Sequence, residues 1–153
     1  MKPDTREILE RAQSICQHQG VRLTEKRRQV LQVVVESPEP LSAYQIADQY
    51  RDVHGRTLSV MSVYRMLKFL KDNDLVHRLE TTNQYISCSH ITCDHAHEVP
   101  QFLICDRCHD VEEVGIRRGI LDELSANIRD TGFQLARQQF EFRGLCRHCA
   151  LSH

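Results

Sequence analysis

Two Cys-x-x-Cys pairs near the end of the chain constrain its folding more than any other feature. Cys105 pairs with Cys108, Cys146 pairs with Cys149, and 37 residues separate the two pairs. Such pairs form the ligand set of a closed four-thiolate zinc site, with each sulfur about 2.3 Å from the metal. The spacer can hold a helix and strands, so a shared metal would join the beginning of a domain to its end. We predict a structural zinc ion on these four thiolates; two disulfides or a redox dithiol are the alternative.

The cysteine count also bears on the compartment. Seven cysteines are an odd number, which argues against a framework made only of disulfides. No apolar run approaches the roughly 18 to 20 residues of a membrane span, and the first residues lack the apolar core of a signal peptide. We therefore expect a cytoplasmic protein, in which thiols stay reduced and paired cysteines bind metal.

The two parts of the chain differ in chemistry on either side of residue 83. Residues 1–83 carry 13 Lys and Arg against 11 Asp and Glu, whereas residues 84–153 carry 7 against 10. Six of the seven cysteines and six of the nine histidines lie in the second part. We expect two domains, 1–83 and 84–153, of which the first is mildly basic and the second is rich in metal ligands.

The first part has the pattern of short helices followed by a β-hairpin. Helices are predicted at about 5–19, 24–36, 42–53 and 60–72. Thr24, Ser42 and Ser59 are expected N-caps, and Cys16 completes the apolar stripe of the first helix. Alternating residues around a polar turn predict a hairpin over 75–88. This order is typical of a winged helix-turn-helix, whose last helix enters the DNA major groove. A helical bundle with a polar outer face is the alternative.

The last predicted helix places four side chains largely off its apolar stripe: Ser62, Tyr64, Arg65 and Lys68. Arginine can form a bidentate contact with guanine, and tyrosine can stack or contact a thymine methyl group. We therefore expect Ser62, Tyr64 and Arg65 to face DNA. The charged run at residues 25–28 is either a solvated helix face or a phosphate contact.

The second part opens with potential ligands: residues 88–98 hold three His, two Cys and two carboxylates. Mixed nitrogen, sulfur and oxygen ligands suit Zn²⁺. Strands are predicted at 101–104, 111–114, 133–136 and 140–142, and an amphipathic helix at 116–130 with Ile120, Leu121, Leu124 and Ile128 inward. A small α/β unit of this kind usually needs a metal or a partner for stability. The predicted class is α+β, with a winged helix-turn-helix domain before a small α/β domain.

No pattern of an enzyme is present. Zinc deaminases combine H-x-E with a later P-C-x-x-C, but here His97 and Glu98 are adjacent and no proline directly precedes Cys105. The sequence also lacks G-x-S-x-G and a phosphate-binding loop. We therefore expect no enzymatic activity.

Motifs in both parts resemble the ferric uptake regulator (Fur) family of metal-dependent repressors. The similar segments are the recognition-helix sequence at 58–67, residues 21–24 with 27–31, residues 41–44, and the paired Cys-x-x-Cys. The similarity covers about residues 5–149. It is strongest to the zinc uptake regulator (Zur) branch, notably at 75–77 and 104–108. Met61 and Ser62 replace the Pro-Thr or Ala-Thr of many members, but serine keeps a hydroxyl, so DNA binding is expected to be retained.

The resemblance implies a homodimer, paired through its second domain, that represses zinc-uptake genes when zinc is bound. An iron- or peroxide-responsive regulator of the same fold is the alternative. The implied regulatory zinc ligands are His77, Cys88, His97 and Glu113, with His95 and Glu112 as the alternatives to the last two. Two zinc ions per subunit are therefore expected. A third site could use His90, Cys93, Asp94, His95 and Glu112, but Arg137 and Gln138 occupy the stretch where some members supply a completing histidine.

The resemblance also implies DNA contacts. Arg65 is the expected base reader, with help from Tyr44 on the preceding helix and with Tyr64 and Ser62 close by. Arg28 and Lys26 are expected phosphate contacts. Asp48 and Arg51 are expected to join neighbouring dimers on one operator, although such an i, i+3 pair is commonly a surface ion pair.

Overall fold

The computed structural model describes residues 4–89, 91–92, 99–136 and 139–152. The chain divides into two compact units, Met1–Cys93 and Asp94–His153. The first unit therefore continues beyond residue 83, where the sequence placed the boundary. The reason is that the second strand of the hairpin pairs with the first, which keeps residues 84–87 with the helices.

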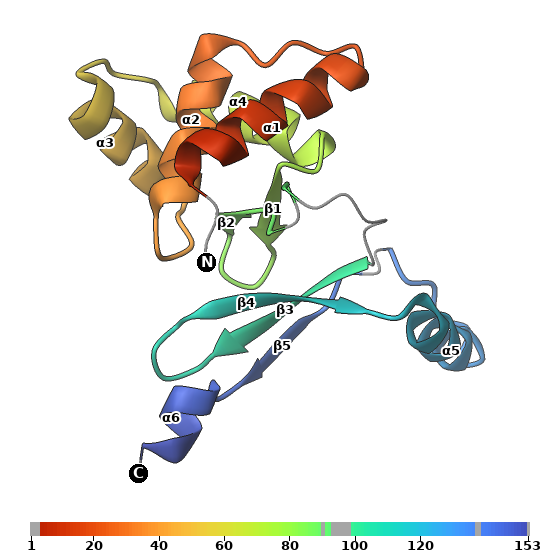
Figure 1. Cartoon of the computed structure of the whole chain (residues 1–153). Coiled ribbons are helices and arrows are strands. Elements are labelled where there is room, and N and C mark those ends of the chain that lie inside the picture. Colours follow the sequence, from red (N-terminus) through yellow and green to blue (C-terminus); the bar gives the residue numbers. More distant parts are fainter. Residues whose placement is uncertain (1–3, 90, 93–98, 137–138, 153) are drawn as a thin grey trace. The chain divides into compact units, whose positions relative to one another are not determined.

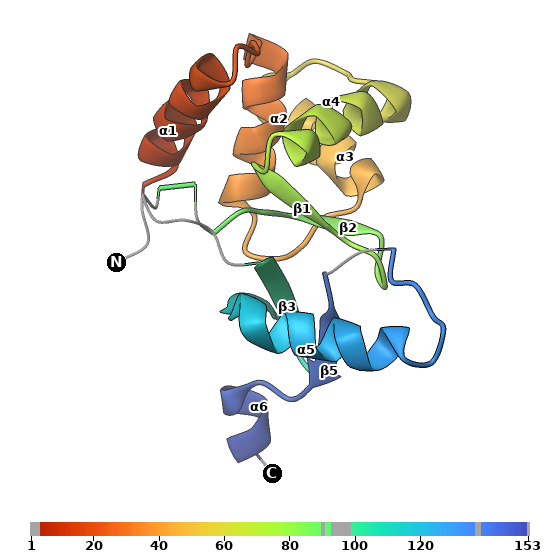
Figure 2. The ribbon, with the colours of Figure 1, turned by 90° about the vertical axis from the view of Figure 1, so that its right-hand side faces the viewer.

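The first unit consists of four helices and a two-stranded hairpin. They are α1 (Thr5–His18), α2 (Glu25–Glu36), α3 (Ala43–His54), α4 (Val60–Asp72), β1 (Val76–Leu79) and β2 (Gln84–Ser87). Figures 1 and 2 show the helices gathered on one side of the hairpin. This is the winged helix-turn-helix order that the sequence predicted.

Side-chain caps begin three of these helices at the predicted residues. The Thr24 side chain accepts a hydrogen bond from the backbone N–H of Arg27. Ser42 and Gln45 form a reciprocal capping box at the start of α3. The Ser59 side chain accepts from the backbone N–H of Ser62. Each cap satisfies backbone donors that have no partner within the helix, so local sequence fixes where the helices begin.

The core of the first unit lies between the helices and the hairpin. α4 contributes Val63, Leu67 and Leu70, which are fully buried at helical spacing. Cys16 on α1 is buried in the same cluster, as predicted, and burial raises the pKa of its thiol although Arg27 opposes the shift. The apolar periodicity of the sequence therefore places the opposite face of α4 in solvent.

The hairpin is antiparallel, with Val76 opposite Ser87, and a bridge between Leu41 and Tyr85 ties it to the segment before α3. Asn83 turns the chain with a φ of 52°, in the left-handed region that asparagine tolerates better than most residues.

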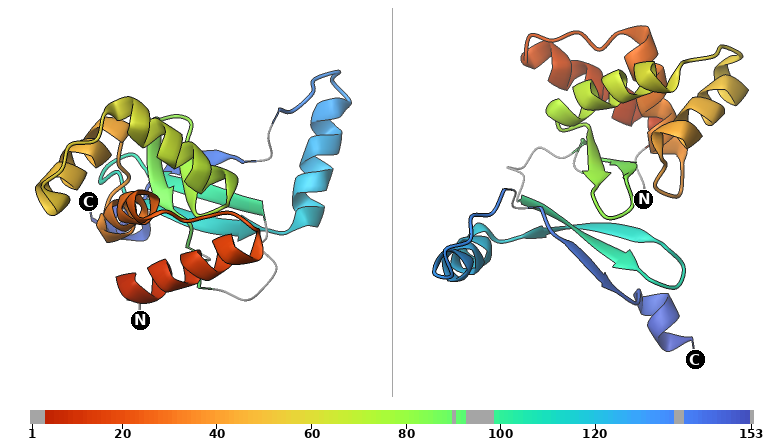
Figure 3. Two further views of the ribbon diagram at one scale, coloured as in Figure 1. Left: turned by 90° about the horizontal axis from the view of Figure 1, so that it is seen from above. Right: turned by 180° about the vertical axis from the view of Figure 1, so that it is seen from behind.

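The second unit is a three-stranded sheet with two helices. Its elements are β3 (Val99–Cys105), β4 (Val111–Ile116), α5 (Arg118–Arg129), β5 (Glu141–Gly144) and α6 (Arg147–Leu151). The strand order is β4-β3-β5, and β3 is antiparallel to β4 but parallel to β5. Figures 1 and 3 show α5 beyond one end of this sheet and α6 at the other end.

Two expectations for the second unit were wrong. Residues 133–136 form no strand, and the Phe133 side chain is 61% exposed. On α5 only Leu121 is buried, whereas Ile120 and Leu124 are exposed. The three-stranded sheet of one chain has too little surface to cover every apolar residue of this unit.

Among the described residues, no helix combines the length and apolar character that crossing a bilayer requires.

Replacing Leu67 by alanine should lower the free energy of unfolding of the first unit by about 2–5 kcal/mol, because it leaves a cavity in the core. Met61 lies on the same helix but is 63% exposed, so Met61→Ala should change stability by less than about 0.5 kcal/mol. Urea unfolding followed by far-ultraviolet circular dichroism measures both. Equal effects would contradict the burial pattern of α4.

Candidate functional site

Parallel pairing of β3 with β5 brings the two Cys-x-x-Cys pairs together. Cys105 ends β3 and is the register partner of Gly144, the last residue of β5. The next residue, Asp106, donates its backbone N–H to the carbonyl of the same Gly144 at 2.8 Å. Because parallel strands end at the same edge of a sheet, both pairs emerge at one place.

Each pair is shaped by its own turn. After the first pair, His109 adopts a φ of 64° and its N–H donates to the Cys105 carbonyl at 3.0 Å. In the second pair, the Cys146 sulfur accepts from the Cys149 N–H at 3.5 Å and caps the short helix α6. The sequence did not predict α6, because a cysteine is an uncommon cap and five residues carry little periodicity.

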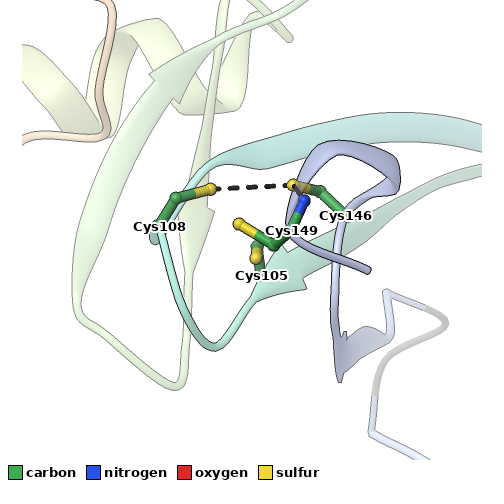
Figure 4. Close-up of side chains that lie close together, drawn as sticks. All are labelled: Cys105, Cys108, Cys146 and Cys149. Atoms are coloured by element: carbon green, nitrogen blue, oxygen red, sulfur yellow. Dashed lines mark hydrogen bonds between the residues drawn. The ribbon is translucent and has the colours of Figure 1, made fainter. Parts of the chain in front are cut away.

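The four sulfurs fit a tetrahedral zinc ion. Figure 4 shows the side chains of all four cysteines converging. Their Sγ atoms all lie within 4.8 Å of one another, and those of Cys108 and Cys146 are 3.8 Å apart. A regular tetrahedron with metal–sulfur distances of about 2.3 Å has edges of about 3.8 Å. The geometry therefore fits the predicted four-thiolate metal site. All four are free thiols, so the alternative of two disulfides is not what the structure contains.

The thiols of this cluster differ in acidity. Backbone N–H groups, that of Cys146 foremost, lower the pKa of Cys105 to about 6. Burial and then the neighbouring thiols raise the pKa of Cys149 to about 12. The pKa of Cys108 is also raised: the Asp110 N–H lowers it, but the Cys105 thiol, burial and other neighbours outweigh that contribution. Four thiolates at these distances repel one another, so full deprotonation requires a cation.

Polar contacts outside the sulfurs hold the two pairs in register. The Arg107 side chain donates to the carbonyls of Cys149 at 3.1 Å and Ser152 at 2.7 Å. Arg143 pairs with Asp106 at 2.8 Å. Sequence reasoning missed these residues. Their positions in the sequence could have identified them. Asp106 and Arg107 lie inside the first Cys-x-x-Cys, and Arg143 lies three residues before the second.

The first unit brings two of the predicted regulatory ligands together. His77 lies on β1, and Cys88 directly follows β2, where its N–H donates to the Leu75 carbonyl at 3.0 Å. A ring nitrogen of His77 and the Cys88 sulfur lie within 4.8 Å of each other. Cys88 is buried and His77 is half-buried. A histidine and a cysteine at this distance could share one zinc ion.

In the second unit, β4 distinguishes the two candidate glutamates. Glu113 lies opposite the buried Phe102, and Glu112 lies opposite Leu103, which is 40% exposed. Residues opposite each other share a face of the sheet and successive residues alternate between faces. Glu113 is accordingly half-buried and Glu112 is exposed. The remaining candidate ligands, His90, Cys93, Asp94, His95 and His97, lie outside the described residues, as do Arg137 and Gln138.

The predicted DNA-contacting side chains are not equally exposed. Arg65 is exposed, and Tyr44 on α3 is 65% exposed. Ser62 is half-buried, and its hydroxyl oxygen accepts a hydrogen bond from the Ser59 hydroxyl at 2.9 Å. Tyr64 is half-buried and packs against the core, so its placement on the outward face was wrong. The reason is that Tyr64 directly follows Val63, close enough in angle to the buried stripe for a large ring to reach it.

The basic residues at the start of α2 differ in their surroundings. The Arg27 guanidinium lies 3.8 Å from the centroid of the Phe69 ring, and Arg27 also donates to the Arg22 carbonyl at 2.8 Å. This cation–π contact joins α2 to α4, so the Arg27 guanidinium is already engaged in contacts within the first unit. Lys26 is exposed and Arg28 is half-buried.

On α3, Asp48 and Arg51 form an exposed ion pair with each other at 3.7 Å. A contact of these residues with a neighbouring dimer stays a prediction.

The sequence matches the ferric uptake regulator family over residues 18–149. The chain belongs to the ferric uptake regulator family. The zinc uptake regulation protein of Escherichia coli (strain K12) is 35% identical over 148 residues, which are 97% of this chain and 84% of that relative. The peroxide operon regulator of Bacillus subtilis (strain 168) is 29% identical over 93% of each chain.

Solved structures are similar to this Fur-family chain over nearly its whole length. A zinc uptake regulator complexed with zinc and DNA superposes with a TM-score of 0.83 at 34% identity and covers 97% of both chains. The crystal structure of holo XcZur superposes with a TM-score of 0.77 at 36% identity, covering 93% of this chain and 96% of that one. The predicted fold class is therefore confirmed.

Replacing Cys105 by serine should reduce the zinc content by one ion per chain and strongly destabilise the second unit, because metal binding contributes folding free energy there. Elemental analysis of protein purified by gel filtration, together with the cobalt-substituted absorption spectrum, measures the loss. Cys16→Ala also removes one buried thiol but lies outside the cluster, so it should keep the zinc. Equal zinc content in the two variants would contradict the four-cysteine site.

Zinc binding to the cluster should release protons near neutral pH. Cys108 and Cys149 must each lose one because their pKa values are raised, whereas Cys105, with a pKa of about 6, is already a thiolate. Affinity should therefore fall as the pH is lowered, most steeply below about pH 6, where Cys105 must also be deprotonated. Competition with a chelator across this range measures the slope. Affinity independent of pH would contradict the assignment.

Proposed function

We propose that this chain is a zinc-responsive transcriptional regulator that binds operator DNA and represses zinc-uptake genes when zinc is bound. The observation that carries the proposal is a complete four-cysteine cluster in a chain that also has a winged helix-turn-helix unit and whose relatives include zinc uptake regulators. The protein acts in the cytoplasm as a homodimer and has no enzymatic activity.

Two zinc sites per subunit account for the ligand chemistry. Cys105, Cys108, Cys146 and Cys149 form the structural site. His77, Cys88, His97 and Glu113 form the regulatory site. For Glu113, the support is its half-buried place on β4 opposite Phe102, which contrasts with the exposed Glu112. A thiolate ligand biases the regulatory site towards zinc over Fe²⁺.

The ligands of the regulatory site come from both units of the chain. His77 and Cys88 belong to the first unit, and His97 and Glu113 belong to the second. Bound zinc would be a divalent cation shared by all four side chains. Ligands from both units on one ion would limit the orientations of the DNA-binding unit relative to the second unit. Operator affinity depends on which orientations are populated. Such couplings typically amount to about 1–3 kcal/mol.

The DNA-binding surface is carried by α4 and the start of α3. Arg65 reads a base edge, and Tyr44 contacts DNA from α3. Ser62 and Tyr64 support the surface from its border, since both are half-buried. Arg28 contacts a phosphate, while Arg27 keeps α2 and α4 together through Phe69.

Pairing of two subunits covers the apolar surface of the second unit. Ile120, Leu124, Phe133 and Phe142 are between 38% and 61% exposed in the single chain. Single exposed apolar residues are ordinary, but several on one small unit indicate an interface. A second copy of the chain buries them.

The deciding experiment measures operator binding against buffered free zinc for the full-length dimer. Cys88→Ser and Glu113→Gln should each fold and keep the structural zinc but lose the zinc response, because a regulatory ligand is missing. Glu112→Gln is the matched control, one residue away on the exposed face, and should respond normally.

The same titration separates the competing sensors. Response to Fe²⁺ but not Zn²⁺, or loss of binding on treatment with peroxide regardless of zinc, would replace the zinc proposal. A normal zinc response of Cys88→Ser would overturn the regulatory ligand set.

A further inference from the structure

The exposed stripe of α4 keeps Arg65 and Lys68 of the set that the sequence placed off the apolar stripe, and it adds Met61. Among the residues of its first three turns, Met61, Arg65 and Lys68 are exposed. Spacings of four and three residues place them in one row along the helix. Ser62 is bonded to Ser59, and Tyr64 packs against the core. Lys68 pairs with Asp72, so the exposed side chains of this row that face a partner directly are those of Met61 and Arg65.

Met61 is the unusual member of this row. Its side chain is 63% exposed although it is apolar and unbranched, and it lies in the first turn of α4. In helix-turn-helix proteins the first residues of the recognition helix contact base edges. The apolar group that the major groove offers is the C5-methyl of thymine.

The charges around Met61 match DNA. α4 carries Arg65, Lys68 and Lys71 against a single acid, Asp72, which pairs with Lys68 at 2.9 Å. This excess of positive charge is suited to the phosphate backbone.

We propose that Met61 is a specificity-determining residue that reads the methyl group of one thymine in each operator half-site. The inference rests on the proposed DNA-binding function. It adds the identity of one base, thymine, and the position of that thymine in the operator. Four residues of helix advance about 6 Å, and successive base pairs are about 3.4 Å apart. The thymine read by Met61 lies within about two base pairs of the guanine read by Arg65.

The test compares thymine with deoxyuridine, which lacks only the methyl group. Zinc-loaded full-length protein first selects an operator from randomised duplexes. Replacing guanines singly by 7-deazaguanine, which lacks the N7 acceptor, marks the one read by Arg65, because Arg65→Ala should abolish that effect. Each thymine within two base pairs of it is then replaced by deoxyuridine.

One of these replacements should weaken binding of the unaltered protein about fourfold, the effect expected for one buried methyl group. In Met61→Ala the same replacement should have no effect, while the circular dichroism spectrum and melting stay unchanged. Val53→Ala is the matched control, because Val53 is 58% exposed on α3 and lies off α4. It should keep the full deoxyuridine effect.

The failures are distinguishable. If no replacement weakens the unaltered protein, or if Met61→Ala keeps the effect, Met61 does not read thymine, while the proposed function stands. If zinc-loaded protein selects no sequence at all, the proposed function itself fails.

Discussion

Four cysteine sulfurs gathered within 4.8 Å of one another are compatible with four thiolates only if a cation balances their charge. The rest of the second unit depends on this constraint. Its sheet has three strands, one flank is the five-residue helix α6, and much of its apolar surface is exposed. The cysteines lie where parallel strands β3 and β5 end, so a metal bound there would join the ends of these two strands. Arg107 and Arg143 add polar contacts between the same two segments.

The first unit is stabilised differently. It has a continuous apolar core to which all four helices contribute, and side-chain caps begin three of the helices. The helices that carry the predicted DNA-contacting residues are therefore held by apolar packing and caps, whereas the second unit gathers four thiols at the ends of two strands.

Intramolecular contacts decide which polar side chains of the reading head are available. Residues 61–65 all lie near the start of α4, but Ser62 bonds to Ser59 and Tyr64 packs inward. Arg27 is charged, like its neighbours Lys26 and Arg28, yet its guanidinium lies over Phe69. A helical wheel separates a buried face from an exposed one. It cannot show that a side chain at the border already forms a hydrogen bond or packing contact with a neighbouring residue.

The sequence by itself determined the elements of the first unit, their caps, the hairpin and the four cysteines that cluster in the second unit. These depend on local rules: apolar spacing, capping chemistry and the ligand spacing of a Cys-x-x-Cys. Tertiary structure alone decided the rest. It excluded a strand at 133–136 and left Ile120 and Leu124 uncovered. It also decided which face of β4 is covered, so that Glu113 is half-buried and Glu112 is exposed. Each of these outcomes depends on what packs against a segment from elsewhere in the chain, and periodicity along the sequence carries no record of that partner.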